Sequence, residues 1–129
     1  MAKTSQLSSA EAAQRAAQAA LDLKANDVVI LDLKGVTDMA DFFVIASGTS
    51  DTHVRAVAQN VEEELRKIGV APRHEEGVAQ GRWALLDYFD FVVHVFHPSL
   101  RQFYQLERLW SDAEVVRVHP REDAPAGAK

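Results

Sequence analysis

The stretch GRWALLDYFDFVVHVF, residues 81–96, decides the fold because it predicts two neighbouring strands joined by a tight turn. Arg82 to Asp87 and Phe91 to Phe96 are short apolar runs, and Tyr88 and Phe89 lie in the connection between them. Two apolar runs with so short a connection are typical of an antiparallel hairpin. We therefore expect this hairpin to form part of a larger sheet, which the flanking sequence must supply.

Two further apolar runs precede the hairpin. Residues 27–33 (DVVILDL) and 41–47 (DFFVIAS) are rich in Val, Ile and Phe, a pattern typical of strands that are buried on both faces. Residues 34–40 (KGVTDMA) connect them and are too few for a crossover helix, so the connection is hairpin-like. Residues 72–77 contain Pro and several charges, which an edge strand tolerates.

Three helices are predicted around these strands. Residues 8–26 are rich in Ala and begin with a capping box in which Ser8 lies three positions before Glu11. Thr49 or Ser50 caps a second helix that runs to about residue 68, with apolar residues at three- and four-residue steps and Gly69 after its end. Residues 98–110 (PSLRQFYQLERLW) begin with Pro, which favours the first turn of a third helix.

Together these elements predict one domain of the α/β class. With 129 residues, 47% of them hydrophobic, the chain can bury one core but not two ordinary ones. We expect a sandwich of flanking helices and a mixed β-sheet of about five strands over residues 1–116. Residues 117–129 turn to His, Pro, Arg, Ala and Gly, which predicts a disordered tail.

Composition narrows the functional classes. The absence of Cys excludes disulfides and thiolate metal sites, and it fits a cytoplasmic protein. No apolar run is long enough for a signal peptide core or a membrane span, so we expect no membrane association. A net charge of −5 works against gripping a phosphate backbone, so a basic protein is a better partner than nucleic acid, and no direct sequence-specific nucleic-acid binding is expected.

Two candidate reactive sites are weak. Residues 47–53 (SGTSDTH) could hold a phosphate at a helix N-terminus, but they lack the P-loop and dinucleotide-binding patterns, and a plain capped turn is favoured. Asp87 and Asp90 flank the hairpin turn without a third acid at Asp-x-Asp spacing, so turn capping is favoured over Mg²⁺ binding.

The two histidines that follow give no stronger signal. His94 and His97 are three apart in a strand and point to opposite faces, so they do not form a metal pair, and His94 is expected to be packed or hydrogen-bonded. No Gly-x-Ser-x-Gly motif is present to supply a serine nucleophile. We predict no catalytic residue, metal or cofactor.

Trp83 favours binding over catalysis. Strand alternation puts Trp83, Leu85 and Asp87 on one face and Ala84 and Leu86 on the other. A face that ends in an acid is too polar for a sheet interior, although Trp83 could still simply cover the sheet edge. Large aromatic residues on such faces are typical anchors of protein interfaces.

The segments VVILDLKGVTDMADFFVIASGTSDTHVRAVA, RWALLDYFDFVVHVFHP and RQFYQLERLWSDA, in this order, make the chain resemble the ribosomal silencing factor family, also called Iojap. The resemblance covers residues 27–113. It implies a fold like that of nucleotidyltransferases without their catalysis. It also implies binding to the large ribosomal subunit through large-subunit ribosomal protein fourteen, which blocks subunit joining and represses translation under nutrient limitation, and it implies self-association as a homodimer.

The resemblance also assigns residues to the partner-binding surface. They are Trp83 and Asp87 of the hairpin and the aromatic pair Phe103 and Tyr104 of the last predicted helix, which Glu107 and Trp110 follow. We predict that Leu85, Tyr88 and Phe89 of the same hairpin also belong to this surface. One departure concerns Phe89, because family members often have Gly at this place in the turn, and a bulky residue there is strained if φ is positive. The alternative reading, a Mg-dependent enzyme of nucleotidyltransferase type, would use Ser47 to Ser50, Asp87 and Asp90.

Overall fold

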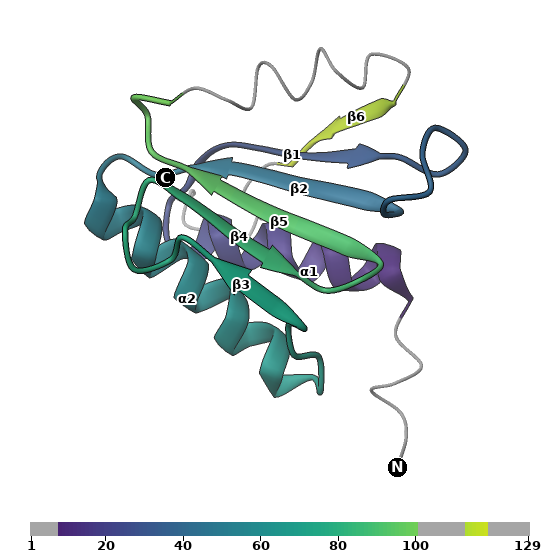
Figure 1. The fold of residues 1–129 in the computed structure, drawn as a ribbon, viewed down its shortest axis with the longest axis horizontal. Helices are drawn as coiled ribbons and strands as arrows, with labels where there is room; N and C mark the ends of the chain where they lie inside the picture. Colours follow the sequence, from purple (N-terminus) through teal and green to yellow (C-terminus); the bar gives the residue numbers. More distant parts are fainter. Residues whose placement is uncertain (1–7, 101–112, 119–129) are drawn as a thin grey trace, which may run out of the picture.

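The computed structural model describes residues 8–100 and 113–118, which form one mixed sheet with two helices (Figure 1). The six strands are arranged in the order β3-β4-β5-β2-β1-β6. The prediction of an α/β domain is confirmed, with one strand more than the five expected. The strands are β1 (Asn26–Asp32), β2 (Phe42–Ser47), β3 (His74–Glu76), β4 (Trp83–Asp87), β5 (Phe91–Phe96) and β6 (Glu114–Arg117).

The predicted hairpin is present, and its register fixes which side chains meet. β4 and β5 pair antiparallel, with Leu85 opposite His94 and Asp87 opposite Val92. β5 also pairs with β2 in parallel, while β1 and β2 form the predicted antiparallel pair. The prediction that residues 27–33 and 41–47 supply buried inner strands is confirmed. The edge strand predicted within residues 72–77 is β3, which pairs with β4.

Both helices cover the same face of the sheet (Figure 1). Helix α1 (Ser9–Asp22) begins with the predicted capping box at Ser8, and helix α2 (Asp51–Lys67) begins after the N-cap Ser50. Their apolar sides enclose the main core with strand residues such as Val44, Leu86 and Val93. Burying this apolar surface supplies most of the driving force for folding. Neither described helix is long and apolar enough to cross a membrane.

A smaller apolar cluster lies on the opposite face of the sheet. It centres on β1 and β2 and includes Phe96 of β5. Its buried members are Val29, Leu31, Leu33, Ala40, Phe43, Ile45, Phe96 and Ala113. This cluster closes the β1–β2 half of that face, whereas the β4–β5 half stays more open, because Trp83 is 41% exposed and Leu85 and Asp87 are half-buried.

Three sequence predictions need correction or fall outside the described residues. The first helix ends at Asp22 rather than residue 26, because the chain turns at Lys24, which has a φ of +63°, and enters β1. Residues 114–117 form β6, which pairs with β1, so Arg117 belongs to the sheet and not to a tail. A four-residue strand exposed on both faces lacks the alternation that reveals strands. Of the predicted third helix, residues 101–110 lie outside the described part of the chain, as do residues 119–129.

Candidate functional site

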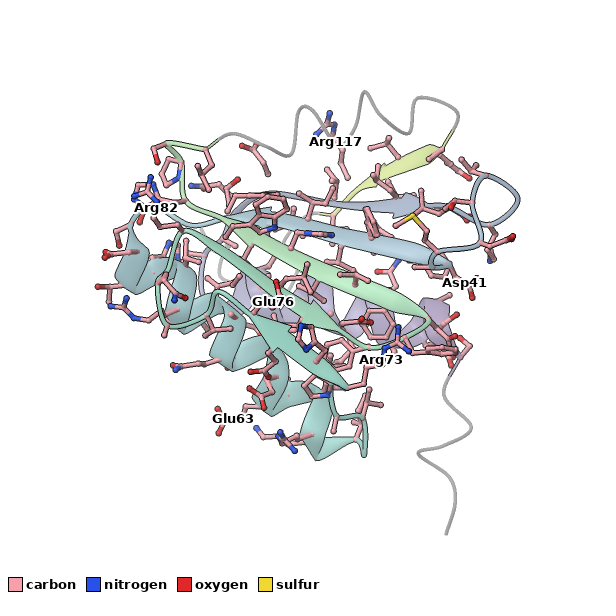
Figure 2. The ribbon with its side chains drawn as sticks, in the orientation of Figure 1. Asp41, Glu63, Arg73, Glu76, Arg82 and Arg117 are labelled. Carbon is pink, nitrogen blue, oxygen red and sulfur yellow. The ribbon has the colours of Figure 1, made fainter. Side chains whose placement is uncertain are left out.

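The candidate site is the open half of the sheet face opposite the two described helices. We call it the outer face and define it by Trp83, Leu85 and Asp87 of β4 and Val92 and His94 of β5. The predicted alternation along β4 is observed, because Ala84 and Leu86 are fully buried under the helices. Figure 2 shows Arg82 and Arg73 at opposite ends of this strand. The outer face therefore offers apolar side chains between Arg82 at one end and the Arg73–Asp87 pair at the other.

Trp83 is held by the residues beneath it. Its indole Nε1–H donates a hydrogen bond of 3.1 Å to Nδ1 of His94, and its ring lies 5.0 Å from the ring of Phe96. Phe43 packs edge-on against His94, with centroids 4.7 Å apart. These contacts orient the indole while leaving part of it exposed. A pre-oriented aromatic side chain loses little conformational entropy on binding, which suits an interface anchor.

His94 is neutral and has a defined tautomer. Because Trp is a donor only, Nδ1 must accept, and the single ring proton of the neutral imidazole lies on Nε2. Burial lowers the pKa of His94 from 6.5 to about 4, since the charged form is poorly solvated. Nε2 itself is buried and has no hydrogen-bond partner within residues 8–100 and 113–118. The predicted packed or hydrogen-bonded histidine is confirmed, but only one of its two nitrogens is satisfied.

Asp87 closes the end of β4. One carboxylate oxygen accepts the backbone N–H of Phe89 at 2.8 Å, and the other pairs with Arg73 Nε at 3.2 Å. The Arg73 guanidinium in turn lies 4.6 Å from the centre of the Phe89 ring. Asp87 is thus a turn-capping residue with a cationic partner. No local sequence pattern points to Arg73, because only the pairing of β3 with β4 brings it there.

The turn that carries Phe89 is tight. The N–H of Asp90 donates to the carbonyl of Tyr88 at 2.9 Å, two residues back, and Phe89 between them has a φ of +75°. The φ at Phe89 is therefore positive, the conformation in which Phe is strained and Gly is not. Phe89 accepts the unfavourable backbone angle, and its side chain is 62% exposed beside Asp87.

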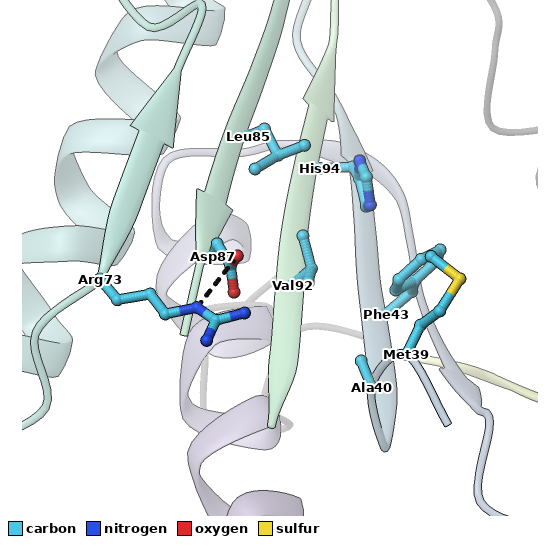
Figure 3. Close-up of a pocket in the computed structure, with 8 residues that line it drawn as sticks. All are labelled: Met39, Ala40, Phe43, Arg73, Leu85, Asp87, Val92 and His94. Atoms are coloured by element: carbon cyan, nitrogen blue, oxygen red, sulfur yellow. Dashed lines mark hydrogen bonds and ion pairs between the residues drawn. The ribbon is translucent and has the colours of Figure 1, made fainter. Parts of the chain in front are cut away.

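A groove of about 370 Å³ lies across the outer face (Figure 3). Its walls are mainly apolar, and the Arg73–Asp87 pair lies on one side. A smaller hollow of about 230 Å³ lies on the other side of Leu85, beside Trp83. The groove is lined by Met39, Ala40, Phe43, Arg73, Leu85, Asp87, Val92 and His94. The sequence analysis does not identify Phe43 and Val92, because their strands have the pattern of core strands, or Met39, because it lies in the connection between β1 and β2.

The structure does not bring every predicted residue to this face. Tyr88 is 7% exposed, packs in the main core and stacks on Phe91 at 4.9 Å, so its side chain lies under the helices and not on the outer face. Burial, together with nearby Glu62 and Glu75, raises the pKa of Tyr88, and its hydroxyl has no hydrogen-bond partner. Phe103 and Tyr104 lie outside the described residues.

The backbone and side chains of the turn at residues 47–53 hydrogen-bond to one another. The Ser50 side chain accepts from the N–H of His53 at 3.1 Å, and the N–H of Thr49 donates to His53 Nδ1 at 2.8 Å. The plain capped turn is therefore what forms. Within residues 8–100 and 113–118, no group of three His, Asp or Glu side chains is arranged to hold a metal ion. Asp87 instead accepts the N–H of Phe89 and pairs with Arg73.

Comparisons with known proteins agree with one another. A family model described as "Ribosomal silencing factor during starvation" matches residues 6–129. The "Ribosomal silencing factor RsfS" of Halalkalibacterium halodurans is 42% identical over 112 residues, which are 87% of this chain and 96% of that protein. The protein of the same name from Bacillus subtilis is 42% identical over 101 residues, 78% of this chain and 86% of that protein.

A crystal structure supports the same assignment. A protein from Chromobacterium violaceum superimposes with a TM-score of 0.75 at 35% identity, covering 79% of this chain and 85% of the solved chain. Sequence similarity and backbone geometry thus point to one family over most of the chain. The chain belongs to the ribosomal silencing factor family.

Proposed function

We propose that this protein represses translation by docking its outer face on large-subunit ribosomal protein fourteen and so blocking the joining of the small subunit. Membership of a family named for ribosomal silencing supports a regulatory role at the ribosome. The observation that carries the proposed surface is Trp83, a large aromatic that is 41% exposed yet held by His94 and Phe96. Aromatic residues that are held in place beside a groove typically contribute a large share of the binding free energy of an interface.

The mechanism requires no chemical step. The docked domain occupies space at the joining face, and repression follows from steric exclusion. The cytoplasm, where ribosomal subunits join, is the proposed site of action. A net charge of −5 suits a basic ribosomal protein, and opposite charge raises the rate of association more than the final affinity. The same apolar face suits a homodimer, in which case self-association and docking compete.

The test is sedimentation of the tagged protein with purified ribosomal subunits. The protein should migrate with large subunits and be absent from joined ribosomes, and preincubated large subunits should join small subunits less completely. Calorimetry with ATP, GTP and CTP plus Mg²⁺ is the control for the enzymatic alternative. Migration with joined ribosomes, or specific nucleotide binding that is lost in Asp87→Asn, contradicts the proposal.

A further inference from the structure

Among the residues that the structure describes, the outer face contains one buried polar atom without a hydrogen-bond partner. Nε2 of His94 carries the ring proton, because Nδ1 accepts from Trp83, yet Nε2 has no acceptor. A buried donor without a partner is unfavourable, and proteins rarely keep one without a reason. His94 lines the groove beside Leu85 and Val92 (Figure 3). The His94 side chain therefore borders the space where, under the proposed function, a partner docks, and docking must uncover Nε2, which is covered in the free protein.

A second histidine shows how the same tautomer is satisfied elsewhere in this chain. Nδ1 of His53 accepts from the backbone N–H of Thr49 at 2.8 Å, so its Nε2–H donates to the backbone carbonyl of Leu23 at 2.6 Å. His94 has the equivalent of the first bond, supplied by Trp83, but lacks the second. What His94 is missing is a carbonyl oxygen or a similar acceptor.

The surroundings of His94 favour a neutral acceptor. Leu85, Val92 and Phe43 give the groove apolar walls, in which an unpaired carboxylate would be poorly solvated. Asp87 already contributes a negative charge, and its cationic neighbour Arg73 is paired with it. Met39 lines the same groove and is 67% exposed, so rotation of its flexible side chain can widen the groove.

From this geometry we propose that His94 is a specificity-determining residue of the docking groove. A segment of the ribosomal protein places an apolar side chain in the groove and a neutral carbonyl oxygen against His94, which donates to it from Nε2. This inference rests on the proposed function and deepens it. In the free protein, the unpaired Nε2–H of His94 then costs free energy that docking recovers. The groove should therefore bind a segment without a carbonyl in that position more weakly.

Two substitutions separate the two nitrogens of His94. In His94→Asn, the side-chain oxygen reaches the Nδ1 position and still accepts from Trp83, but no donor reaches the Nε2 position. In His94→Gln, the longer side chain carries an N–H donor to about the Nε2 position. The affinity for purified large subunits should fall about tenfold in His94→Asn. In His94→Gln, which gives up the acceptor for Trp83 but leaves Trp83 packed on Phe96, the affinity should fall less than in His94→Asn. Val116→Ala, on β6 at the far edge of the sheet, is the control and should bind like wild type.

The outcomes discriminate between the two proposals. If the wild-type protein fails to bind large subunits, the proposed function fails and this inference falls with it. If the wild type binds and His94→Asn binds equally well, or His94→Asn and His94→Gln lose the same affinity, only the inference is overturned. Thermal unfolding of each variant shows whether it is folded at the temperature of the assay.

A measurement on the wild-type chain covers the case in which His94→Asn does not fold. Proton–nitrogen NMR of protein labelled at histidine should show His94 as the Nε2–H tautomer. When purified large-subunit ribosomal protein fourteen is added, that proton should shift downfield and exchange more slowly with water. A complex that forms with the His94 resonance unchanged overturns the inference.

Discussion

The indole Nε1–H of Trp83 donates to Nδ1 of His94 over 3.1 Å, and this bond joins a residue that is 41% exposed to one that is 5% exposed. The orientation of the exposed ring thus depends on the protonation state of a buried one. A proton on Nδ1 would place two donors face to face and break the contact. The proposed interface anchor and the stability of the sheet are therefore linked through one imidazole.

The first prediction concerns acid stability. In the folded protein burial holds the pKa of His94 at about 4, against an ordinary value of 6.5. Between these values the unfolded chain binds a proton that the folded chain does not, so the free energy of unfolding falls as the pH is lowered from 6.5 to 4 and falls no further from this cause below 4. The loss amounts to about 3 kcal/mol.

The check is urea unfolding of wild type and His94→Asn at pH 7 and at pH 4.5. Other groups titrate in this range in both proteins, so the difference between their pH dependences isolates His94. The variant should lose less stability on acidification. Parallel curves for the two proteins would show that His94 is not held neutral by the fold.

Tyr88 offers a test of the division between the two faces. Its hydroxyl is buried without a partner among groups that include Glu62, and its ring packs in the main core. Tyr88→Phe keeps the ring and removes the unsatisfied polar atom, so stability should stay the same or rise by up to about 1 kcal/mol. Binding to large subunits should not change. A substantial loss of binding with intact folding would place Tyr88 at the interface after all.

The turn at Phe89 predicts an unusual order of stabilities. At a φ of +75°, Gly is unstrained, whereas Ala keeps the strain, and both lose the contact of the Phe89 ring with Arg73. Phe89→Gly should therefore be more stable than Phe89→Ala by roughly 1 kcal/mol, although Gly is the more flexible residue in the unfolded chain. Chemical denaturation of both variants measures this. Phe89→Ala as the more stable of the two would mean that the turn relaxes to a negative φ.

Most of the sheet could be predicted because the local sequence pattern of each inner strand is typical of a strand. Residues 27–33 and 41–47 are unbroken apolar runs, and the alternation of Trp83, Ala84 and Leu85 indicates which side chains face the helices. β6 could not be predicted, because its four residues are exposed and depend on pairing with β1. The end of the first helix was overestimated, because Ala-rich sequence gives no stop signal before Lys24.

The site could be predicted only in part, because its remaining residues meet through tertiary contacts. Trp83, Leu85 and Asp87 follow from strand periodicity, and the strain at Phe89 follows from the residue type. Arg73 and Met39 reach the groove from separate segments, and no local pattern connects them with β4. The missing partner of His94 is visible only when both nitrogens are placed in three dimensions.

The central claim, that Trp83 anchors docking on the large subunit, is tested most directly by measuring affinity and thermal unfolding on one preparation of Trp83→Ala. Val116→Ala is the matched control, because Val116 is also 41% exposed but lies on β6, at the far edge of the sheet. Trp83→Ala should lose about 2–4 kcal/mol of binding free energy, a loss of about thirtyfold to a thousandfold in affinity, and remain folded.

Val116→Ala should bind as wild type does. This account predicts that Trp83→Ala leaves the large-subunit fraction of a sucrose gradient at concentrations where wild type and Val116→Ala remain in it. A folded Trp83→Ala variant that still migrates with large subunits at wild-type affinity contradicts it.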